Sequence, residues 1–551
     1  MEMIRTMLFA ALALVLFMMY QAWQKDYPPV MATPAAVTTT EDGRIASASD
    51  APAIPVDSTS SNNSPVPQIA ALTAPKGQRI TVLTDVYDIE IDTRGGDIVK
   101  TRLRNYPDSI EQDSKDFLLM NDGGGDSHLF IAQSGLLAKD SPDHTSTYSV
   151  AATQYEMEEG ADSLKVTLFW QNQNGLRVEK RYTFFRGRYD FDLDYDVANN
   201  TGQQWKGSLY RQYKRGEDTG VETSSFIYTF TGAVVSNTEN PYEKYTHDDL
   251  QDEKLKLEMT GGWVAMIQHY FLAAWLADPS ENNHVYSKAS DGNKYVIGMV
   301  TPQQTVAAGE TRTLKSRMFV GPKLQSQLAT AAPNLSLTVD YSWLTILADP
   351  LFWLLEWFYS LFGNWGWAII AVTAVIKLVF FKLSEASYKS MAKLRLVTPR
   401  LNTLKERFGD DKAGFQKAMM KMYQEEKINP LGGCLPILIQ IPVFIALYWV
   451  LLESVEMRQA PFIFWLNDLS KADPYFVLPL LMGATMLLQQ RLNPAPLDPI
   501  QKKVMGMLPI VFTVFFAFFP SGLVLYWVVN NTLSIAQQWV ITKRIASGEM
   551  K

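Results

Sequence analysis

One basic side chain, Lys377, stands inside an apolar stretch twelve residues after Trp365. At 1.5 Å per residue this is about 18 Å along a helix, in the inner half of a membrane span. A lysine at mid-membrane costs about 2.5–3.5 kcal/mol, and no acidic residue lies near it within the apolar stretches. Its ammonium either extends to the headgroups or supplies a positive charge to a wet cavity. On Lys377 alone the two readings are evenly balanced.

Polar residues at helical spacing favour the cavity. Thr373 precedes Lys377 by four residues and shares its helix face. Hydrogen bonding between helices explains any one such residue. Together with an unpaired lysine, they fit a water-filled groove better, because each polar group must be satisfied by a partner helix or by water. Further polar residues in the apolar stretches are Gln440, Thr485, Gln489, and the stripe Asn530, Ser534 and Gln537.

Composition argues against several functional classes. A formal net charge of −7 argues against direct nucleic-acid binding. The single cysteine, Cys434, permits no internal disulfide and no cysteine-based zinc or iron–sulfur site. The five histidines show no metal-ligand spacing, and neither a P-loop nor a nucleophile elbow is present. We therefore expect no enzyme activity, no catalytic residues, no cofactor and no bound metal.

Apolar runs predict a membrane protein with six transmembrane helices. An N-terminal anchor occupies 1–25, with its apolar run from Met7 to Trp23. Two of the remaining five runs have sixteen and thirteen residues, fewer than the ~20 that a span needs. Local thinning of the bilayer is one hypothesis for them. The five runs are 365–381, 431–452, 475–490, 507–519 and 523–541.

The chain before the five runs divides into three segments. Residues 26–77, rich in Pro, Ala, Ser and Thr, predict a disordered tether. Residues 78–322 show a period of two, with apolar residues alternating with aspartates from Tyr189 to Val197, which predicts a large antiparallel β-sandwich. A hairpin is expected around Asn174-Gly175, and a buried strand pair within 262–276. Residues 340–364, rich in aromatics, predict an interfacial amphipathic helix.

Charge in the loops predicts the orientation. Between Lys382 and Lys427 there are eleven basic and six acidic residues, which marks a cytoplasmic loop. Both termini are then cytoplasmic and the sandwich lies on the outer face. Within the loop, 383–428 predicts a helical hairpin with a basic face. This hairpin is either a pair of solvated helices or a docking surface for ribosomes, targeting factors or anionic lipid, and the two readings carry equal weight.

Four motifs resemble the YidC/Oxa/Alb family of membrane protein insertases. They are Asn429-Pro430-Leu431-Gly432-Gly433-Cys434, Gln440-Ile441-Pro442-Val443-Phe444, Arg458-Gln459-Ala460-Pro461-Phe462 and the run from Phe519 to Trp527. The resemblance covers 339–544 closely. It extends over the anchor, tether and outer domain, as in Gram-negative members.

The resemblance implies a five-helix core within 365–545 and a groove open to the cytoplasm and to lipid. The family's groove arginine falls on Lys377, which keeps the charge and loses the planar fork. The substrate slide falls on Phe444 and Phe512, and Trp527 stands where some members have tyrosine. The implied role is a bacterial inner-membrane insertase and chaperone. Its implied partners are nascent membrane-protein clients, the Sec translocon, the ribosome, signal-recognition targeting factors and membrane lipids.

Two other classes remain alternatives. A secondary transporter would show inverted repeats, and no convincing repeat is found among the five runs. A periplasmic carbohydrate-active enzyme would place its chemistry in 78–322 and would make the five later spans unnecessary. The outer domain of the resembled family is similar to sugar-processing sandwiches. That similarity implies no activity, since function must be argued from a site. Deleting most of the sandwich separates these readings, because an insertase would keep its activity and an enzyme would lose it.

Overall fold

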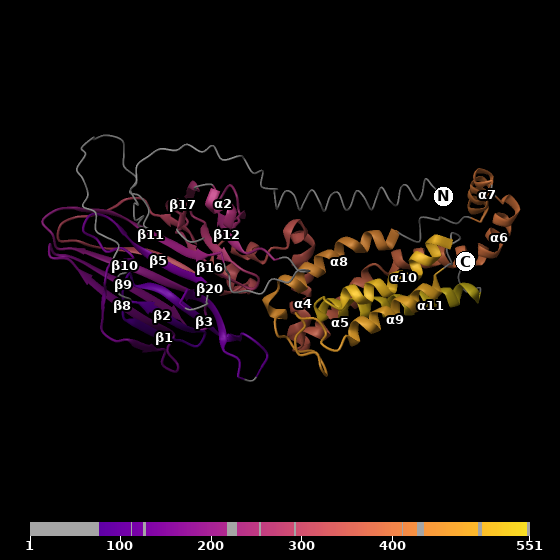
Figure 1. The fold of residues 1–551 in the computed structure, drawn as a ribbon, viewed down its shortest axis with the longest axis horizontal. Coiled ribbons are helices and arrows are strands. Elements are labelled where there is room, and N and C mark those ends of the chain that lie inside the picture. Colours follow the sequence, from indigo (N-terminus) through magenta and orange to yellow (C-terminus); the bar gives the residue numbers. More distant parts are fainter. Residues whose placement is uncertain are drawn as a thin grey trace, which may run out of the picture.

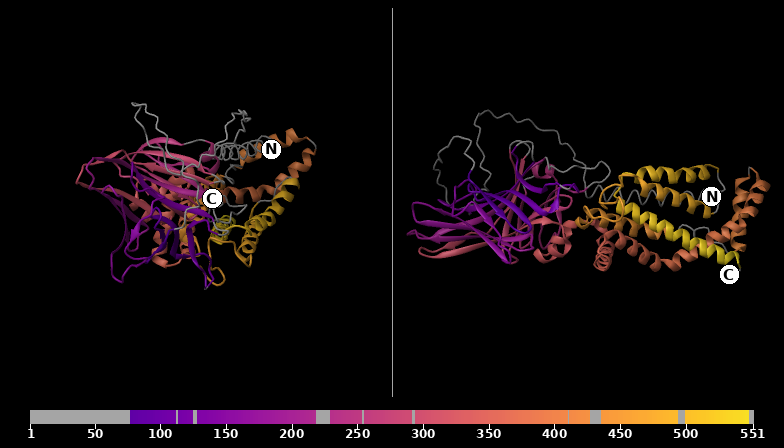
Figure 2. Two further views of the ribbon diagram at one scale, coloured as in Figure 1. Left: turned by 60° about the vertical axis from the view of Figure 1, so that its left-hand side comes forward. Right: turned by 90° about the horizontal axis from the view of Figure 1, so that it is seen from below.

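The computed structural model has an elongated shape with a β-sandwich at one end and helices at the other (Figure 1). It describes residues 77–547, with gaps at 112, 125–127, 218–228, 253–254, 291–293, 410, 427–434 and 494–498. The expected anchor at 1–25, nearly all of the expected tether and the motif 429–434 therefore lie outside the described residues. A long helical region follows the sandwich, and a helical hairpin forms the far end (Figure 2).

The larger sheet has eleven strands, and its order places β11 near the centre. The order is β14-β17-β18-β11-β5-β4-β3-β2-β1-β7, with β19 paired to β11. The pairs are antiparallel except β1 with β7, which is parallel. Its strands are β1 (Arg79–Leu83), β2 (Tyr87–Asp92), β3 (Asp97–Pro107), β4 (Asp116–Asp122), β5 (Leu129–Leu137), β7 (Gln154–Glu156), β11 (Trp205–Gly216), β14 (Lys256–Thr260), β17 (Asn282–Ser290), β18 (Lys294–Val300) and β19 (Gln304–Val306).

The smaller sheet has nine strands in the order β13-β12-β15-β16-β20-β10-β9-β8-β6. The expected hairpin is confirmed as β8 and β9, and the buried pair as β15 and β16. The strands are β6 (Ser149–Val150), β8 (Ser163–Gln171), β9 (Leu176–Phe185), β10 (Asp190–Asn199), β12 (Gly232–Ser236), β13 (Glu243–Tyr245), β15 (Trp263–Ile267), β16 (Phe271–Leu276) and β20 (Thr311–Pro322), and a short helix α2 (His247–Asp252) follows β13.

The strand β10 shows how the alternating sequence builds the sandwich core. Phe191, Leu193 and Tyr195 are fully buried, because every second side chain of a strand points to the same face. The aspartates between them face outward, and Arg181 of β9 pairs with Asp194 and Asp196. One face of the sheet is therefore apolar and the other charged, as the period of two predicted.

The chain beyond the sandwich is helical. No single helix in the described part of the chain has both the length and the apolar composition that crossing a bilayer requires. One pair bent by 67°, Trp365–Val379 with Phe381–Phe408, meets both criteria when taken together, and Gln440–Glu453 is a shorter apolar helix. The elements are α3 (Gln325–Ala331), η1 (Leu335–Val339), η2 (Ser342–Leu344), α4 (Thr345–Phe362), α5 (Trp365–Val379), α6 (Phe381–Phe408), α7 (Lys412–Glu425), α8 (Leu435–Glu453), η3 (Val455–Met457), α9 (Val477–Leu492), α10 (Pro499–Phe516) and α11 (Ser521–Ala546).

The helices α6 and α7 pack on each other as a hairpin at the end of the molecule remote from the sandwich (Figure 1). Val397 and Leu401 of α6 are buried against Phe415 and Met419 of α7. The turn between them follows Gly409, which ends α6 at a positive φ of 50°. The period of three to four residues in this loop therefore reflects an apolar seam inside the hairpin.

Sandwich and helices meet at a polar junction around the end of α8. His269, in the turn between β15 and β16, donates from Nε2 to the carbonyl of Leu452 at 3.0 Å. Burial lowers the pKa of His269 to about 3, so the ring is neutral. Arg458 donates to the carbonyl of Pro107 in the β3–β4 hairpin at 2.8 Å. These contacts attach the β15–β16 turn of the smaller sheet and the β3–β4 hairpin of the larger sheet to the helical region.

Glu456 of this junction should make stability depend on pH. Burial raises the pKa of Glu456 from its usual 4.5 to about 7, and its Oε2 is buried without a hydrogen-bond partner. The folded pKa exceeds the unfolded one. The stability that the protonated form contributes is therefore complete below pH 4.5 and is lost as pH rises through 7. The full loss is on the order of 3 kcal/mol. We expect a lower thermal midpoint at pH 8 than at pH 5 in detergent.

The variant Glu456→Gln should shrink that pH difference, because the amide stays neutral at both values. Glu111→Gln is the matched control, since Glu111 is exposed on the β3–β4 hairpin. Scanning calorimetry of both variants at pH 5 and pH 8 checks the expectation. An equal pH difference in wild type and Glu456→Gln would contradict it.

Candidate functional site

Lys377 lies on the last turn of α5 and points to α11. Its Nζ donates to Oγ of Ser534 at 2.8 Å, although the two residues are 157 positions apart. The helix α5 begins at a capped end, where the side chain of Asn364 accepts from the N–H of Trp367. It ends at Val379, and after Phe380 the helix α6 departs at 67°. Lys377 is therefore held at the corner between two helices.

A chain of hydrogen bonds extends from this lysine along α11. The hydroxyl of Ser534 donates to the carbonyl of Asn530 at 2.7 Å, and it is also hydrogen-bonded to Tyr388 of α6. Oδ1 of Asn530 accepts from Nε2 of Gln440 on α8 at 2.7 Å. Four helices thus contribute polar side chains to one track, which we call the polar track and define as Lys377, Ser534, Asn530, Gln440 and Tyr388.

Three of the residues expected at this site lie differently. Thr373 is fully buried, and its hydroxyl donates to the carbonyl of Ile369 in its own helix, so it does not meet Lys377. Gln537 donates to the carbonyl of Phe381 at 3.2 Å and joins α11 to the start of α6. Among the described residues, no hydrogen bond joins the side chain of Gln489 on α9 to the polar track.

The two expected slide residues are linked by aromatic rings. Phe444 of α8 packs on Trp527 of α11, with ring centroids 4.9 Å apart. Trp527 in turn meets Phe516 of α10 at 5.8 Å, and Phe516 meets Phe512 at 6.0 Å. The indole Nε1 of Trp527 is buried without a hydrogen-bond partner. An apolar surface from three helices therefore adjoins the polar track.

A second polar seam joins α11 to α9, and of its four residues only Thr485 was expected from the sequence. On the side of α11 facing α9, Asn531 donates to Oγ1 of Thr485 at 3.3 Å, and Gln538 donates to Oδ1 of Asn493 at 2.9 Å. Asn531 and Gln538 directly follow Asn530 and Gln537 in the sequence. These two pairs of adjacent amides were the signal in the sequence, because neighbouring residues of a helix point to different faces and so place polar groups on two of them. The seam fastens α9 to α11.

Lys377 has no ion-pair partner among the residues that the structure describes. An ammonium carries three N–H donors, and Ser534 receives one. Two donors therefore remain for water or for polar groups of a visiting chain. Since opposite charges attract more strongly where water is scarce, this cation should favour carboxylates and carbonyls.

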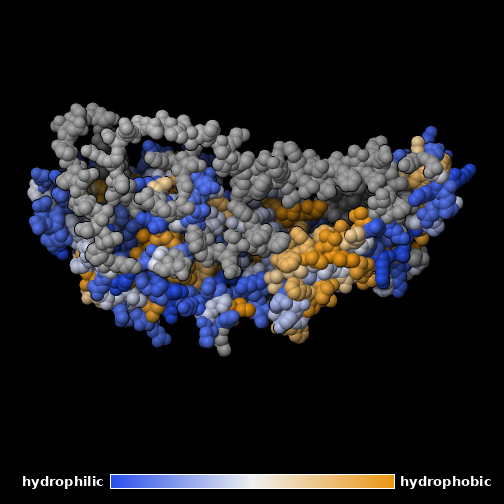
Figure 3. Space-filling model, in the orientation of Figure 1, coloured by the Kyte–Doolittle hydropathy of each residue, from blue (hydrophilic) through white to orange (hydrophobic). Residues whose placement is uncertain are grey.

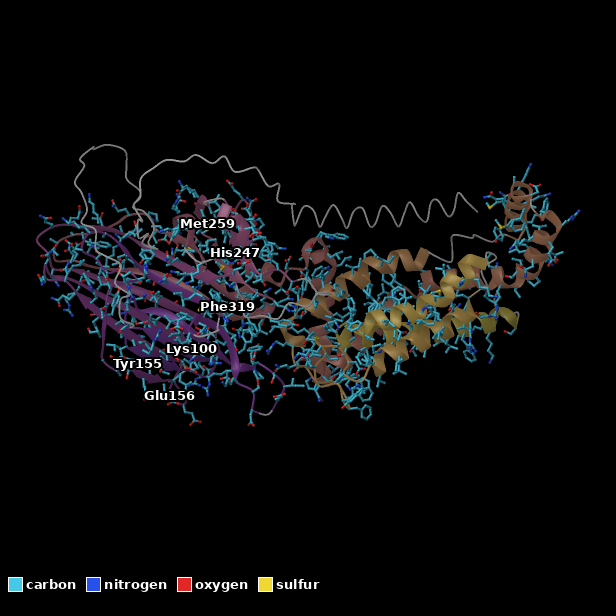
Figure 4. All side chains as sticks on the ribbon, viewed as in Figure 1. Lys100, Tyr155, Glu156, His247, Met259 and Phe319 are labelled. Atoms are coloured by element: carbon cyan, nitrogen blue, oxygen red, sulfur yellow. The ribbon has the colours of Figure 1, made fainter. Side chains whose placement is uncertain are left out.

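The described residues contain no group of three or more His, Cys, Asp or Glu side chains that could hold a metal ion. Their histidines are dispersed over the sandwich. His144 bonds Tyr210, His284 bonds Glu258, and His247 packs on Tyr295. His247 lies on the sandwich, far from α5 and α11 (Figure 4). These positions provide no assembled acid–base pair near the polar track.

Comparison with known proteins decides the family. Residues 79–354 match the family described as the YidC periplasmic domain, and residues 357–548 match the 60Kd inner membrane protein family. The membrane protein insertase YidC of Nitrosococcus oceani is 50% identical over 99% of both chains. The protein of the same description from Methylococcus capsulatus is also 50% identical over 99% of both chains. The chain belongs to the YidC family.

A solved structure gives the same name. It is described as an active YidC insertase with its first transmembrane domain resolved, and it covers 84% of this chain and 92% of its own. The identity is 18% and the TM-score is 0.38, which adds no argument to the sequence matches. Members of this family are inner-membrane proteins with a periplasmic domain, and they are insertases rather than enzymes.

Proposed function

We propose that this chain inserts and folds other membrane proteins, with the polar track as the place where a client's hydrophilic segment first enters the bilayer. The main observation that supports this proposal is that Lys377 donates to Ser534 and keeps two further N–H donors available for a client. The adjoining rings of Phe444 and Trp527 offer an apolar path for the client's transmembrane helix. Burial of that helix in lipid supplies the driving force, at ~25 cal/mol per Å².

The surface supports the placement of the bilayer. A hydrophobic band covers the helical region between the hydrophilic sandwich and the hydrophilic hairpin (Figure 3). In our proposal this band is the lipid-facing surface, and with the N-terminal anchor the chain crosses the membrane six times. The sandwich is then periplasmic, α4 lies in the outer interface, and both termini and the α6–α7 hairpin are cytoplasmic. Exposed apolar residues of the band include Leu378, Val379, Leu480, Ile510, Val514 and Trp539.

The α6–α7 hairpin is the proposed docking surface for the ribosome, targeting factors or anionic lipid. Most of its apolar residues pack in its own seam, although Leu396 and Met420 are exposed, and Arg400 of α6 pairs with Glu426 just after α7 at 2.8 Å. The excess of basic residues therefore remains on the outside, where it can meet phosphate groups. The Sec translocon is a proposed partner within the membrane, where the chain works beside it or alone.

Site-specific photocrosslinking tests the proposal. A photoreactive residue at Phe444 should crosslink to ribosome-stalled nascent membrane proteins, because this ring lies next to the polar track. The matched control is Phe169, a partly exposed ring on the outer face of the sandwich. Crosslinks from Phe444 and none from Phe169 are expected. Equal labelling from the two positions, or none from Phe444, would refute a client path along α8.

A further inference from the structure

An ion pair joins the sandwich to the helix α8, and it is almost completely shielded from water. Nζ of Lys323, the residue after β20, lies 3.8 Å from Oε2 of Glu453, the last residue of α8. Their side chains are only 2% and 4% exposed. Burying two opposite charges costs several kcal/mol for each ion unless the pair is well placed. Stability alone is therefore a weak reason for such a pair.

Neighbouring contacts show that the pair belongs to a clamp on the outer end of α8. The backbone N–H of Lys323 donates to the carbonyl of Tyr270 at 2.9 Å, which ties it to the β15–β16 turn. His269 of that turn holds the carbonyl of Leu452, the residue before Glu453. On the other side, Ser454 is within hydrogen-bond distance of Tyr341 at 3.4 Å. Three consecutive residues at the end of α8 are thus held from outside the helix.

The clamped helix carries Phe444 of the proposed client path and Gln440 of the polar track. Phe444 lies nine residues before Glu453, about 13 Å along the helix. Pro442 stands between Phe444 and Gln440 inside α8 and has no N–H for the helical hydrogen bond, so the helix can bend there. The outer half of α8 therefore moves with its clamped end, whereas Gln440 lies beyond the proline and is bonded to Asn530.

We propose that Lys323 is a positioning residue. Through its ion pair with Glu453 it fixes the outer half of α8, and thereby the distance of Phe444 from Trp527. The sandwich edge then sets the α8 side of the client path. Deletion of most of the sandwich should therefore be tolerated only if Lys323 and the β15–β16 turn remain. The effect on client insertion rests on the proposed function. The clamping of α8 by Lys323 rests only on the contacts at the junction.

Removing and exchanging the two charges tests it. Lys323→Met leaves Glu453 without its ion-pair partner, and Glu453→Gln leaves Lys323 without its partner. The double variant Lys323→Glu/Glu453→Lys restores an ion pair with its signs exchanged. The first readout is the rate of disulfide formation between Phe444→Cys and Trp527→Cys, in a background with Cys434→Ser. The second is client insertion in proteoliposomes, measured with Phe444 and Trp527 intact. The matched control is Lys100→Met, whose ion pair with Glu90 lies within the sandwich.

Each single variant should slow disulfide formation and lower insertion about five- to tenfold, the double variant should lie within about twofold of wild type, and Lys100→Met should change neither readout. Single variants that match wild type, or a double variant impaired as much as the two singles combined, would overturn the inference. If neither single variant accumulates in the membrane, the abundance of the double variant becomes the readout. Abundance near that of wild type supports the inference, and abundance as low as that of the single variants overturns it.

The two readouts keep the inference separate from the proposed function. The disulfide assay needs no client, so uncoupled behaviour there removes the role of Lys323 and leaves the insertase function standing. Conversely, suppose that the single variants slow disulfide formation and the double variant restores it, but Phe444 gives no crosslink to nascent chains. The positioning role of Lys323 would then stand, and the client path would be refuted.

Discussion

Lys377→Glu is expected to lower insertion of clients with acidic translocated segments at least tenfold, with a much smaller effect on purely apolar clients. The substitution turns attraction into repulsion at a site where the lysine has no ion-pair partner among the described residues. Two unit charges 4 Å apart interact by about 4 kcal/mol at an effective dielectric constant of 20. Since about 1.4 kcal/mol corresponds to a factor of ten, even a partial loss of this interaction is measurable.

Two further variants separate charge from packing at the same position. Lys377→Arg keeps the charge and should retain most activity, whereas Lys377→Met keeps the length of the stem and should fall between wild type and Lys377→Glu. Insertion into proteoliposomes of two clients that differ only in the acidity of the translocated tail provides the measurement. If Lys377→Glu inserts both clients as wild type does, the charge has no role in entry.

Asp473→Ala is expected to cause the largest loss of stability in the helical region. Asp473 is 1% exposed, and its carboxylate accepts hydrogen bonds from Nε1 of Trp465 at 2.9 Å and from the N–H groups of Tyr475 and Leu478 at 3.0 and 2.7 Å. It therefore satisfies free N–H groups at the start of α9, where a negative charge is also favourable. Removing it leaves three donors unsatisfied at about 1–3 kcal/mol each where they are buried.

We expect the thermal midpoint of the detergent-solubilised protein to fall by roughly 10 °C, given about 2–4 °C per kcal/mol for a region of this size. Asp473→Asn is the control, because it keeps one acceptor oxygen and should lose less than half as much. A midpoint of Asp473→Ala within about 2 °C of wild type would show that the loop before α9 is held by other contacts.

The elements whose pattern is local could be predicted from the sequence. The aspartates alternating along β10, the strands β15 and β16 and the α6–α7 hairpin each follow from a period of two or of three to four. Ser534 and Asn530 were found in the same way, because polar residues four apart share a helix face. The motif resemblance supplied Phe444 and Phe512.

What depends on contacts between distant segments could not be predicted. Lys323 and Glu453 are 130 positions apart, and each reads in sequence as an ordinary surface charge. Thr373 was expected beside Lys377 because it lies four residues away, yet its hydroxyl satisfies its own helix, which is the common local alternative for threonine. The partner of Gln440 and the second seam at Asn531 depend on which helices pack together, and helical periodicity does not encode that.

Water access to position 377 is the most direct test of the account. A Lys377→Cys variant, in a background with Cys434→Ser, is exposed in inverted and right-side-out vesicles to a charged, membrane-impermeant thiol reagent. We predict rapid labelling from the cytoplasmic side and none from the periplasmic side, because our proposal places Lys377 in a wet groove that opens only to the cytoplasm. Absence of labelling from both sides, or labelling from the periplasm, would contradict a cytoplasm-facing polar groove.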